Sequence, residues 1–242
     1  MELAGRSAIV TGGAVRVGRA ITLALAAAGV DVFIHYNRSA GPAQDTAAEA
    51  RSLGVRTAIG SVDLSDPAAA PDLVAMASDA LGPVSLLVNS ASGFPEDTLA
   101  DLTLDRWRHT HDLTLASPIF LTQAFAAALG DNDGAVVNVT DVKTHRPYTK
   151  RFSYIVAKGG IDTFTRAAAV ALAPTIRVNA VALGVILPPT GEDETYAARL
   201  ADELPLRRIG GTGPVADTVL FLLRNDFLTG EIVRVDGGGH LV

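Results

Sequence analysis

Tyr154 and Lys158 stand four residues apart in the segment SYIVAKGG, which reads as a helix start with Ser153 as its N-cap. Four residues are about one helical turn, so the phenol and the ammonium group project from the same face. A nearby ammonium group favours the phenolate and lowers the pKa of the phenol. The pair therefore predicts proton transfer to an oxygen or nitrogen that is being reduced. By itself, the same spacing also fits an ordinary amphipathic helix.

A glycine-rich turn near the amino terminus has the composition of a phosphate-binding loop. The turn TGGAVRVG follows the apolar run 7–11 and precedes a helical pattern that begins near Val17. Gly12 and Gly13 permit a tight turn, and Gly18 lets the helix approach the strand. The N–H groups at the helix start can then face a pyrophosphate. The order of strand, turn and helix is the one that dinucleotide binding requires.

The end of the second strand carries a basic residue. Twenty residues after Gly18, where an NAD site usually has an acid, the chain has Arg38. Arg38, with Ser39 beside it and Arg16 in the glycine-rich turn, offers charge-assisted hydrogen bonds to a 2′-phosphate. We therefore predict NADPH rather than NADH, since two surface arginines rarely coincide with these two places. Asp63 could accept a hydrogen bond from the adenine amine or cap the next helix.

Length and composition narrow the class of protein. The 242 residues suit one α/β domain, and the hydrophobic (48%) and charged (19%) fractions are those of a soluble globular protein. No apolar run approaches the roughly 20 residues that span a bilayer. The absence of cysteine excludes disulfides and thiolate chemistry. A net charge of -6 argues against nucleic-acid binding. No secretory signal is visible, so we expect a cytoplasmic protein with no membrane partner.

Strand and helix patterns alternate along the whole chain. This alternation predicts a single doubly wound, parallel seven-stranded sheet, a Rossmann fold with helices on both faces, in one domain spanning 1–242. Residues 186–213 are rich in proline, glycine and acids, and we interpret them as an irregular lid over a pocket. The predicted strands are 7–11, 31–36, 56–62, 84–89, 135–140, 177–183 and 232–235, and the main helices are 17–29, 42–53, 104–129, 153–173 and 214–224.

These motifs together resemble the short-chain dehydrogenase/reductase superfamily over essentially the whole chain. The resemblance lies in TGxxxxxG, in VNSAS after the fourth strand, and in YxxxK followed by an RVNAV strand. More narrowly, the chain resembles the pteridine reductases, whose turn reads TGxxxRxG, with arginine at the position of Arg16, and which share HYxRS. Most of the superfamily has a serine thirteen residues before the tyrosine, whereas this chain and the pteridine reductases have an aspartate, here Asp141.

The chemistry of Asp141 can be argued separately from the resemblance. A serine hydroxyl donates to a carbonyl oxygen, but an ionised carboxylate only accepts hydrogen bonds and would repel a developing alkoxide. Asp141 therefore disfavours simple ketones. It favours a substrate with N–H donors, such as an aminopyrimidine ring, or a proton relay through Tyr154 to a ring nitrogen. A surface aspartate that caps the following segment is the alternative, although strand ends above a doubly wound sheet are where ligands bind.

The resemblance also implies roles for residues at matching positions. Phe94 matches the aromatic side chain that stacks on a pterin, and Thr114 stands where the superfamily has an asparagine that holds a relay water. Leu183–Gly184 replaces the family's Pro–Gly. The implied catalytic residues are Asp141, Tyr154 and Lys158. The implied substrate contacts are Ser92, Phe94, Asp141 and Tyr154. The implied NADPH contacts are Gly12, Arg16, Val17, Tyr36, Asn37, Arg38, Ser39, Asp63, Leu64, Asn89, Ala91, Tyr154, Lys158, Gly184 and Ile186.

The predicted function is NADPH-dependent reduction of a pteridine-type substrate, with Tyr154 as the proton donor. The resemblance also implies a homotetramer that uses the long helices and the carboxyl-terminal strand. Two alternatives stay open. One is a carbonyl reductase of oxoacyl or sugar ketones, which Asp141 disfavours. The other is a non-catalytic NADPH sensor, which would need neither Tyr154 nor Lys158.

Overall fold

A single parallel sheet forms the centre of the molecule. The computed structural model describes residues 1–188 and 194–242, and the side chains of 194–197 are not described. In these parts of the chain, seven strands pair in the order β3-β2-β1-β4-β5-β6-β7, all parallel. The predicted fold class is therefore confirmed. The strands are β1 Ser7–Val10, β2 Asp31–Tyr36, β3 Thr57–Ser61, β4 Leu86–Asn89, β5 Gly134–Asp141, β6 Ile176–Leu183 and β7 Ile232–Val235.

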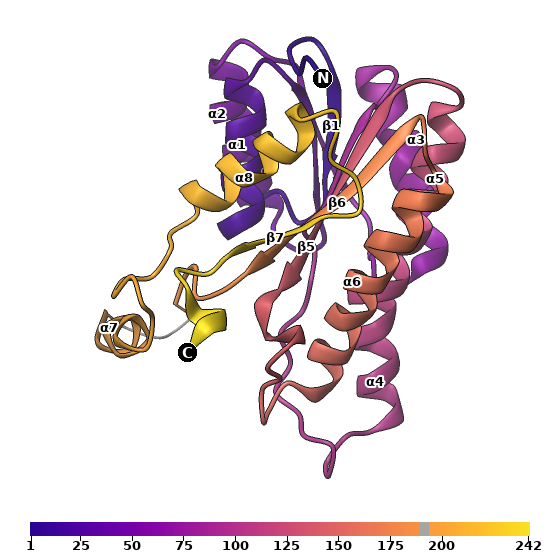
Figure 1. Cartoon of the computed structure of the whole chain (residues 1–242). Helices are drawn as coiled ribbons and strands as arrows, with labels where there is room; N and C mark the ends of the chain where they lie inside the picture. The colour runs from indigo at the N-terminus through magenta and orange to yellow at the C-terminus, as the bar shows by residue number, and fades with distance from the viewer. Residues whose placement is uncertain (189–193) are drawn as a thin grey trace.

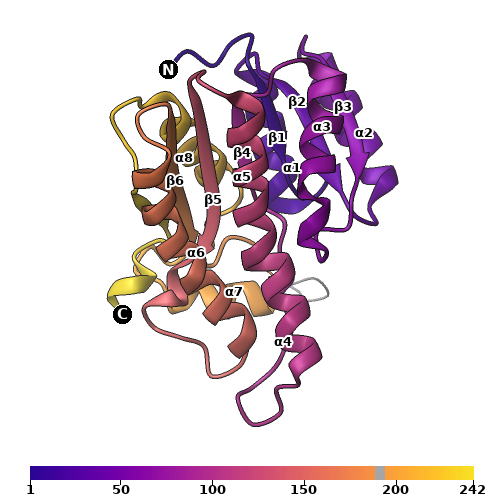
Figure 2. The same cartoon turned by 90° about the vertical axis from the view of Figure 1, so that its right-hand side faces the viewer.

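Helices cover both faces of the sheet (Figures 1 and 2). One apolar core lies between the sheet and α1, α2 and α8, and a second lies between the sheet and α3, α5 and α6. Because both faces are covered, the central strands β1 and β4 are buried along their whole length, as parallel strands usually are. The helices are α1 Arg16–Ala27, α2 Ala40–Ser52, α3 Ala70–Leu81, α4 Leu104–His111, α5 Ser117–Leu129, α6 Phe152–Ala171, α7 Glu194–Asp202 and α8 Gly213–Arg224.

The order of the strands creates a crevice at their carboxyl ends. Neighbouring strands β1 and β4 are connected to the rest of the chain in opposite directions, and ligands bind at such a switch point in doubly wound sheets. Thr11 joins the two turns there, because its hydroxyl oxygen accepts from the N–H groups of Ser90 (2.9 Å) and Ala91 (3.0 Å). Close packing of the first turn requires glycine: a Cβ on Gly18 would lie 2.1 Å from the carbonyl oxygen of Gly12.

The predicted helical region 104–129 contains a wider turn. α4 and α5 are joined without a break by the π-helical segment η2, Asp112–Ala116. By length and hydropathy alone, Leu104–Leu129 could cross a membrane, a test that core helices of soluble proteins also pass. Here α5 packs on α3 and the sheet through Leu121, Phe125 and Leu129.

The predicted lid is not irregular throughout. α7 occupies nine of its residues, and the interpretation of 186–213 as an unstructured segment was therefore wrong over Glu194–Asp202. The helix was missed because the segment is rich in acidic residues and has few apolar residues to show a helical period. Residues 189–193, in the middle of this segment, lie outside the described residues. In Figure 1, α7 lies apart from the other helices, below the carboxyl ends of the strands.

Candidate active site

Three donors converge on the carboxylate at the end of β5. The Tyr154 hydroxyl donates to Oδ2 of Asp141 at 3.0 Å, and the Tyr148 hydroxyl donates to the same oxygen at 3.3 Å. The other oxygen, Oδ1, accepts from the N–H of Lys143 at 2.8 Å and so caps the short helix η3, Val142–Thr144. The carboxylate is buried. Tyr148 was not predicted as a site residue, because it belongs to no motif and its reach to Asp141 depends on the fold of the intervening loop.

The environment keeps Tyr154 protonated. Burial raises the pKa of the phenol well above its ordinary value, and the negative charge of Asp141 and the neighbouring Tyr148 act in the same direction. Burial likewise raises the pKa of Asp141, opposed by the Lys143 N–H, the Tyr154 hydroxyl and the charge of Lys158. A buried phenol that donates to a carboxylate is suited to giving up a proton during a reduction.

Lys158 lies near the Tyr154 ring and is fixed by a backbone carbonyl. Its ammonium group donates to the carbonyl oxygen of Val139 at 2.7 Å and lies 5.6 Å from the centroid of the Tyr154 ring. Burial lowers the pKa of Lys158 to about 8, opposed by the charges of Asp141 and Asp162. Burial and Asp141 dominate the phenol and hold its pKa high in this structure, and the lowering of that pKa by Lys158 stays a prediction.

The start of α6 is fixed by a carboxylate from another part of the chain. Ser153 was predicted to be the N-cap, and this was wrong. It lies inside the first turn of the helix, and Arg151 is the cap residue. The buried Asp97 accepts from the Ser153 N–H at 3.0 Å and from the Ser153 hydroxyl, and its own carbonyl accepts from the Phe152 N–H at 3.2 Å. Asp97 thus satisfies the free N–H groups of the helix that carries Tyr154.

An aromatic side chain borders the Tyr154 phenol. Phe94 lies edge-on to the Tyr154 ring, with 4.8 Å between centroids and 88° between the planes, and it is 47% exposed. The guanidinium group of Arg151 lies over the Phe94 ring, 4.2 Å from its centroid, and donates to the Phe94 carbonyl oxygen at 2.7 Å. The structure therefore brings Phe94 beside Tyr154 with Arg151 over one face of its ring, and the exposed remainder is open to a ligand.

The π-helical segment brings Thr114 to the site. The Thr114 hydroxyl is buried, and its oxygen lies 3.5 Å from that of Ser92. π-Helical turns occur frequently at functional sites because they redirect a side chain. Ser92 itself donates to the carbonyl of Gly93 at 3.1 Å. Both hydroxyls lie next to the loop that carries Phe94.

The glycine-rich turn leaves the start of α1 open. Val15, the residue before the helix, makes no side-chain cap, and the first turn has no acidic residue. The N–H groups at this end can therefore bind an anion. Those of Gly12 and Gly13 are already used, because they donate to Nδ1 (3.2 Å) and to the carbonyl oxygen (3.0 Å) of His35. This geometry fits the pyrophosphate of a dinucleotide at Val17 and its neighbours.

Polar residues meet at the carboxyl ends of β2 and β3. Arg38 is exposed and close enough to Asp63 to lower the pKa of that carboxyl, although the hydrogen bonds from Ser65 act more strongly. Asp63 accepts from Ser65 and, at 3.3 Å, from Asn37, while Asp66 caps the following short helix η1, Pro67–Ala69. The alternative interpretation of Asp63 as the helix cap is therefore wrong. Tyr36 ends β2, and Ser39 immediately precedes α2.

Arg16 adopts the left-handed backbone conformation, with φ at 53°, which explains why glycine would suit this position. Its guanidinium group donates to the carbonyl oxygen of Pro188 at 2.9 Å and so connects the glycine-rich turn to the start of the predicted lid. A 2′-phosphate would compete with or add to this contact. The expected phosphate contact of Arg16 stays a prediction.

Some predicted cofactor residues turn their side chains inward. Leu64 and Ile186 are buried in the two apolar cores, and the Asn89 amide donates to Asn138 at 2.9 Å. Leu64 and Ile186 could therefore offer a cofactor their backbone groups, whereas the buried Asn89 Oδ1 has no hydrogen-bond partner among the described residues. Ala91 approaches the turn after β1, where a Cβ on Gly12 would lie 3.2 Å from its Cα. Gly184 lies against Asp236, and a Cβ there would be 2.5 Å from the Asp236 side chain.

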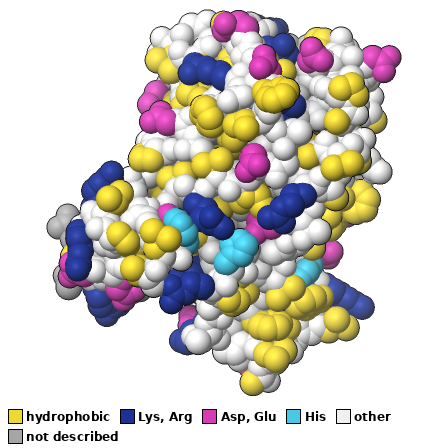
Figure 3. All heavy atoms as spheres, in the orientation of Figure 1, with side chains coloured by type: hydrophobic (Ala, Val, Ile, Leu, Met, Phe, Trp, Pro, Cys, Tyr) yellow, Lys and Arg dark blue, Asp and Glu magenta, His cyan; other side chains and the backbone are white. Residues whose placement is uncertain are grey.

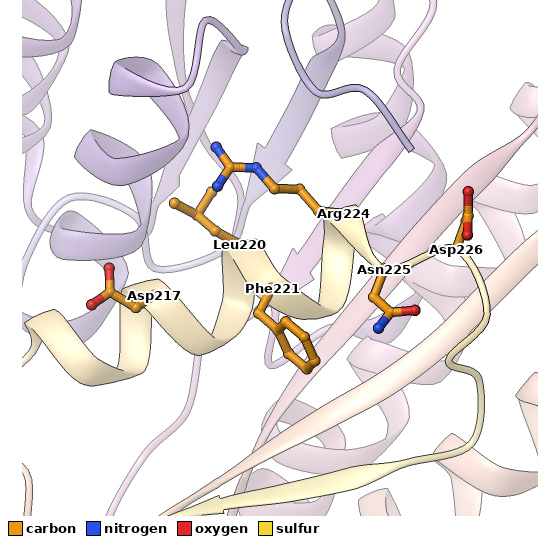
Figure 4. Close-up of a pocket in the computed structure, with 6 residues that line it drawn as sticks. All are labelled: Asp217, Leu220, Phe221, Arg224, Asn225 and Asp226. Atoms are coloured by element: carbon orange, nitrogen blue, oxygen red, sulfur yellow. The ribbon is translucent and has the colours of Figure 1, made fainter.

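Two hollows lie among the residues that the structure describes, and only one of them borders a predicted site residue. One hollow has a volume of about 510 Å³. Figure 4 shows the six residues that line it, on α8 and just after it: Asp217, Leu220, Phe221, Arg224, Asn225 and Asp226, none of which is a predicted site residue. A second hollow of about 510 Å³ lies beyond β6 and β7, with Val185, Ile186, Arg208 and Arg234 in its wall. Within the described part of the chain, no cluster of three or more His, Asp or Glu side chains could hold a metal ion.

The sequence and fold match known oxidoreductases. A family model described as enoyl-(acyl carrier protein) reductase matches residues 13–240. L-Xylulose reductase of Bos taurus is 36% identical over 98% of both chains. The chain belongs to the short-chain dehydrogenase/reductase superfamily. Another relative is the protein assigned as ketoacyl reductase 2 of the granaticin polyketide synthase of Streptomyces violaceoruber. It is 35% identical over 97% of this chain and 96% of its own length.

Solved structures resemble this superfamily member over its whole length. FolM alternative dihydrofolate reductase 1 from Brucella canis, complexed with NADP, has a TM-score of 0.93 and 37% sequence identity, covering 100% of this chain and 97% of its own. A blue fluorescent protein from a metagenomic library, in complex with NADPH, has a TM-score of 0.91 and 30% identity over 99% of both chains. These two complexes agree with the predicted cofactor.

Proposed function

We propose that the protein is an NADPH-dependent reductase of a pteridine-type heterocycle, such as a dihydropterin or dihydrofolate. The observation that carries the proposal is the hydrogen bond from Tyr154 to the buried Asp141 carboxylate, beside the exposed ring of Phe94. A carboxylate is a poor partner for a ketone oxygen but accepts from the N–H groups of an aminopyrimidine. The likeness to an alternative dihydrofolate reductase supports the same substrate class.

The residues of the chain divide the work of a two-electron reduction. Bound NADPH supplies the hydride for an electrophilic ring carbon. The open start of α1, which follows the turn at Gly12, holds the pyrophosphate, while Arg38 and Ser39 bind the 2′-phosphate. Gly184 and Ile186 offer backbone groups to the nicotinamide end. The cytoplasm, the source of reduced NADPH, is the proposed location.

Asp141 and Tyr154 complete the reaction at the substrate. Asp141 accepts N–H hydrogen bonds from the ring and fixes its orientation over Phe94. Tyr154, kept protonated by burial and by Asp141, gives its proton to the ring nitrogen next to the reduced carbon. Lys158, whose ammonium group lies 5.6 Å from the centroid of the Tyr154 ring and whose pKa burial lowers to about 8, offsets the phenolate charge left behind. Thr114, whose hydroxyl oxygen lies 3.5 Å from that of Ser92, would hold the relay water that the superfamily's asparagine holds.

The experiment follows NADPH oxidation at 340 nm with dihydrobiopterin, dihydrofolate and a panel of sugar and oxoacyl ketones. Turnover of the pterins is expected, with little or none of the ketones. Tyr154→Phe should abolish turnover while the NADPH dissociation constant stays within about twofold, since the phenol hydroxyl acts on the substrate. Wild-type turnover by Tyr154→Phe would exclude the phenol as the proton donor.

A second candidate is a carbonyl reductase of sugar or oxoacyl substrates. The relatives that act on L-xylulose and that are assigned to ketoacyl reduction favour it. Asp141→Ser places a hydroxyl donor where a ketone oxygen would bind. Under the pteridine proposal this variant should lose pterin turnover and gain ketone turnover relative to the wild type. Ketone turnover that exceeds pterin turnover in the wild-type protein would support the second candidate. Failure to oxidise NADPH with every substrate would instead support the non-catalytic sensor.

We also propose a homotetramer. The edge strand β7 pairs only with β6 among the described strands, and α8 exposes Phe221 (51%) while the turn before β7 exposes Phe227 (97%). An open sheet edge next to exposed aromatic rings is the kind of surface that a second copy covers. Sedimentation equilibrium measures the number of copies. A monomer at micromolar concentration would contradict the proposal.

A further inference from the structure

The loop between β5 and α6 is unusually basic for this chain. Residues 142–152 contain Lys143, Arg146, Lys150, Arg151 and His145, and no acid, although the whole chain has 26 acidic and only 20 basic residues. Both ends of the loop join the candidate site, through Asp141 at one end and the start of α6 at the other. Figure 3 shows dark blue and cyan side chains gathered across this lower part of the molecule, between α7 and the region of α4.

Arg151 is the member of this loop whose position is most closely defined. It has φ at 69°, a left-handed conformation that non-glycine residues rarely adopt and that is frequent at functional sites. Its Nη1 donates to the Phe94 carbonyl oxygen, and its plane lies over the Phe94 ring. Among the described residues, its Nε and Nη2 have no hydrogen-bond partner. The neighbouring Glu96 pairs with Lys150 at 2.7 Å.

We infer that Arg151 binds an anionic group, a carboxylate or a phosphate, carried on the substituent of the ring that stacks on Phe94. This inference rests on the proposed function and names its substrate class more closely. The two unused N–H groups of a guanidinium plane match the two oxygens of such an anion. The centroids of the Tyr154 and Phe94 rings are 4.8 Å apart, and the guanidinium carbon of Arg151 lies 4.2 Å from the Phe94 centroid. The Phe94 ring therefore separates the charge of Arg151 from the Tyr154 phenol.

The field of the loop supports an anion at this place. Lys143 and Arg146 have no ion-pair partner within the described ranges, 1–188 and 198–242, so their charges are not cancelled there. Lys150 is largely neutralised by Glu96. Cations around a cleft raise the local concentration of an anionic substrate and speed its association in a salt-dependent way.

The test compares pairs of substrates that share a ring and differ in charge. Dihydrofolate carries the carboxylates of its glutamate tail, whereas dihydrobiopterin has a neutral side chain; dihydroneopterin and its phosphate ester form a second pair, which separates phosphate from carboxylate recognition. For each pair, kcat/KM is measured for the wild type and for Arg151→Ala. The ratio of anionic to neutral substrate should fall about ten- to a hundredfold in the variant for the anion that is recognised.

Two further variants separate recognition from support of the loop. Arg151→Lys keeps the charge but not the planar pair of donors, so it should retain part of the ratio. Arg166→Ala removes the same charge from an exposed position on α6 and should leave the ratio unchanged. High salt should lower kcat/KM for the anionic substrate of the wild type and have much less effect in Arg151→Ala.

Equal losses for the charged and the neutral substrate in Arg151→Ala would overturn the inference, because they would mean that Arg151 only holds Phe94. That result would leave the proposed function intact. If the wild-type protein neither reduces nor, by calorimetry in the presence of NADP, binds any of the four pterins, the proposed function and this inference fall together.

Discussion

Asp97 is expected to hold the catalytic helix in place, and Asp97→Ala tests this. The side chain is 1% exposed and accepts from both the N–H and the hydroxyl of Ser153, the residue before Tyr154. A hydrogen bond to a charged group contributes about 1.5–3 kcal/mol. Two such bonds are lost in Asp97→Ala, and relief from burying a charge offsets part of the loss. We expect the free energy of unfolding to fall by about 3 kcal/mol.

Two milder variants serve as controls. Asp97→Asn keeps an oxygen for the Ser153 N–H, and Ser153→Ala removes only the hydroxyl, so each should lower the free energy of unfolding by about 1 kcal/mol. Asp97→Ala should also lower kcat more than the NADPH affinity, because it frees the turn that positions Tyr154 and not the glycine-rich turn.

The assay is urea unfolding followed by circular dichroism and by the fluorescence of Trp107, the only tryptophan. Measurements at two protein concentrations separate unfolding from dissociation of an oligomer. A loss of less than about 1 kcal/mol in Asp97→Ala, with unchanged kcat, would refute the view that this carboxylate anchors α6.

Three more perturbations have defined outcomes. Arg38→Ala should raise the dissociation constant of NADPH about ten- to a hundredfold and that of NADH much less, as measured by fluorescence titration; an equal change for both would remove the 2′-phosphate assignment. Tyr148→Phe removes a hydrogen bond that lowers the pKa of Asp141, so that pKa rises, the carboxylate protonates at higher pH, and the acid limb of the kcat/KM profile should move to higher pH; an unmoved limb would mean that ionised Asp141 is not required. Gly18→Ala should lower the free energy of unfolding by about 3 kcal/mol and abolish NADPH binding, since the added Cβ would meet the Gly12 carbonyl; normal stability in urea would show that the turn can relax.

The sheet could be predicted from the sequence because its strands are short and contain β-branched residues, and because the first five are each followed by a helical pattern. The strand order follows from right-handed crossovers in a doubly wound sheet. The meeting of Asp141 and Tyr154 could also be expected from their motif, and the structure brings them to 3.0 Å. Local sequence patterns are enough to predict a contact when the topology of the sheet already places the two residues next to each other.

Contacts between loops could not be predicted in this way. Asp97 and Arg151 lie in segments with no periodicity, and their contacts with Ser153 and Phe94 depend on how two loops pack. Lys158 lies near the Tyr154 ring, as expected, but its hydrogen bond to the Val139 carbonyl could not be predicted; a buried ammonium group requires a close acceptor, and spacing does not say which one. Sequence spacing alone does not predict the hydrogen-bond partner of a long, flexible side chain.

The π-helical segment Asp112–Ala116 has a consequence for insertions and deletions. Such a turn holds one residue more than an α turn, so removing a residue there converts it to regular α-helix. The face that α4 presents to α6 and the face that α5 presents to the sheet would keep their register on either side. A one-residue deletion within this segment is therefore predicted to preserve the fold while moving Thr114 away from Ser92. The position of a site residue can thus change along this helix without a change in how the helix packs.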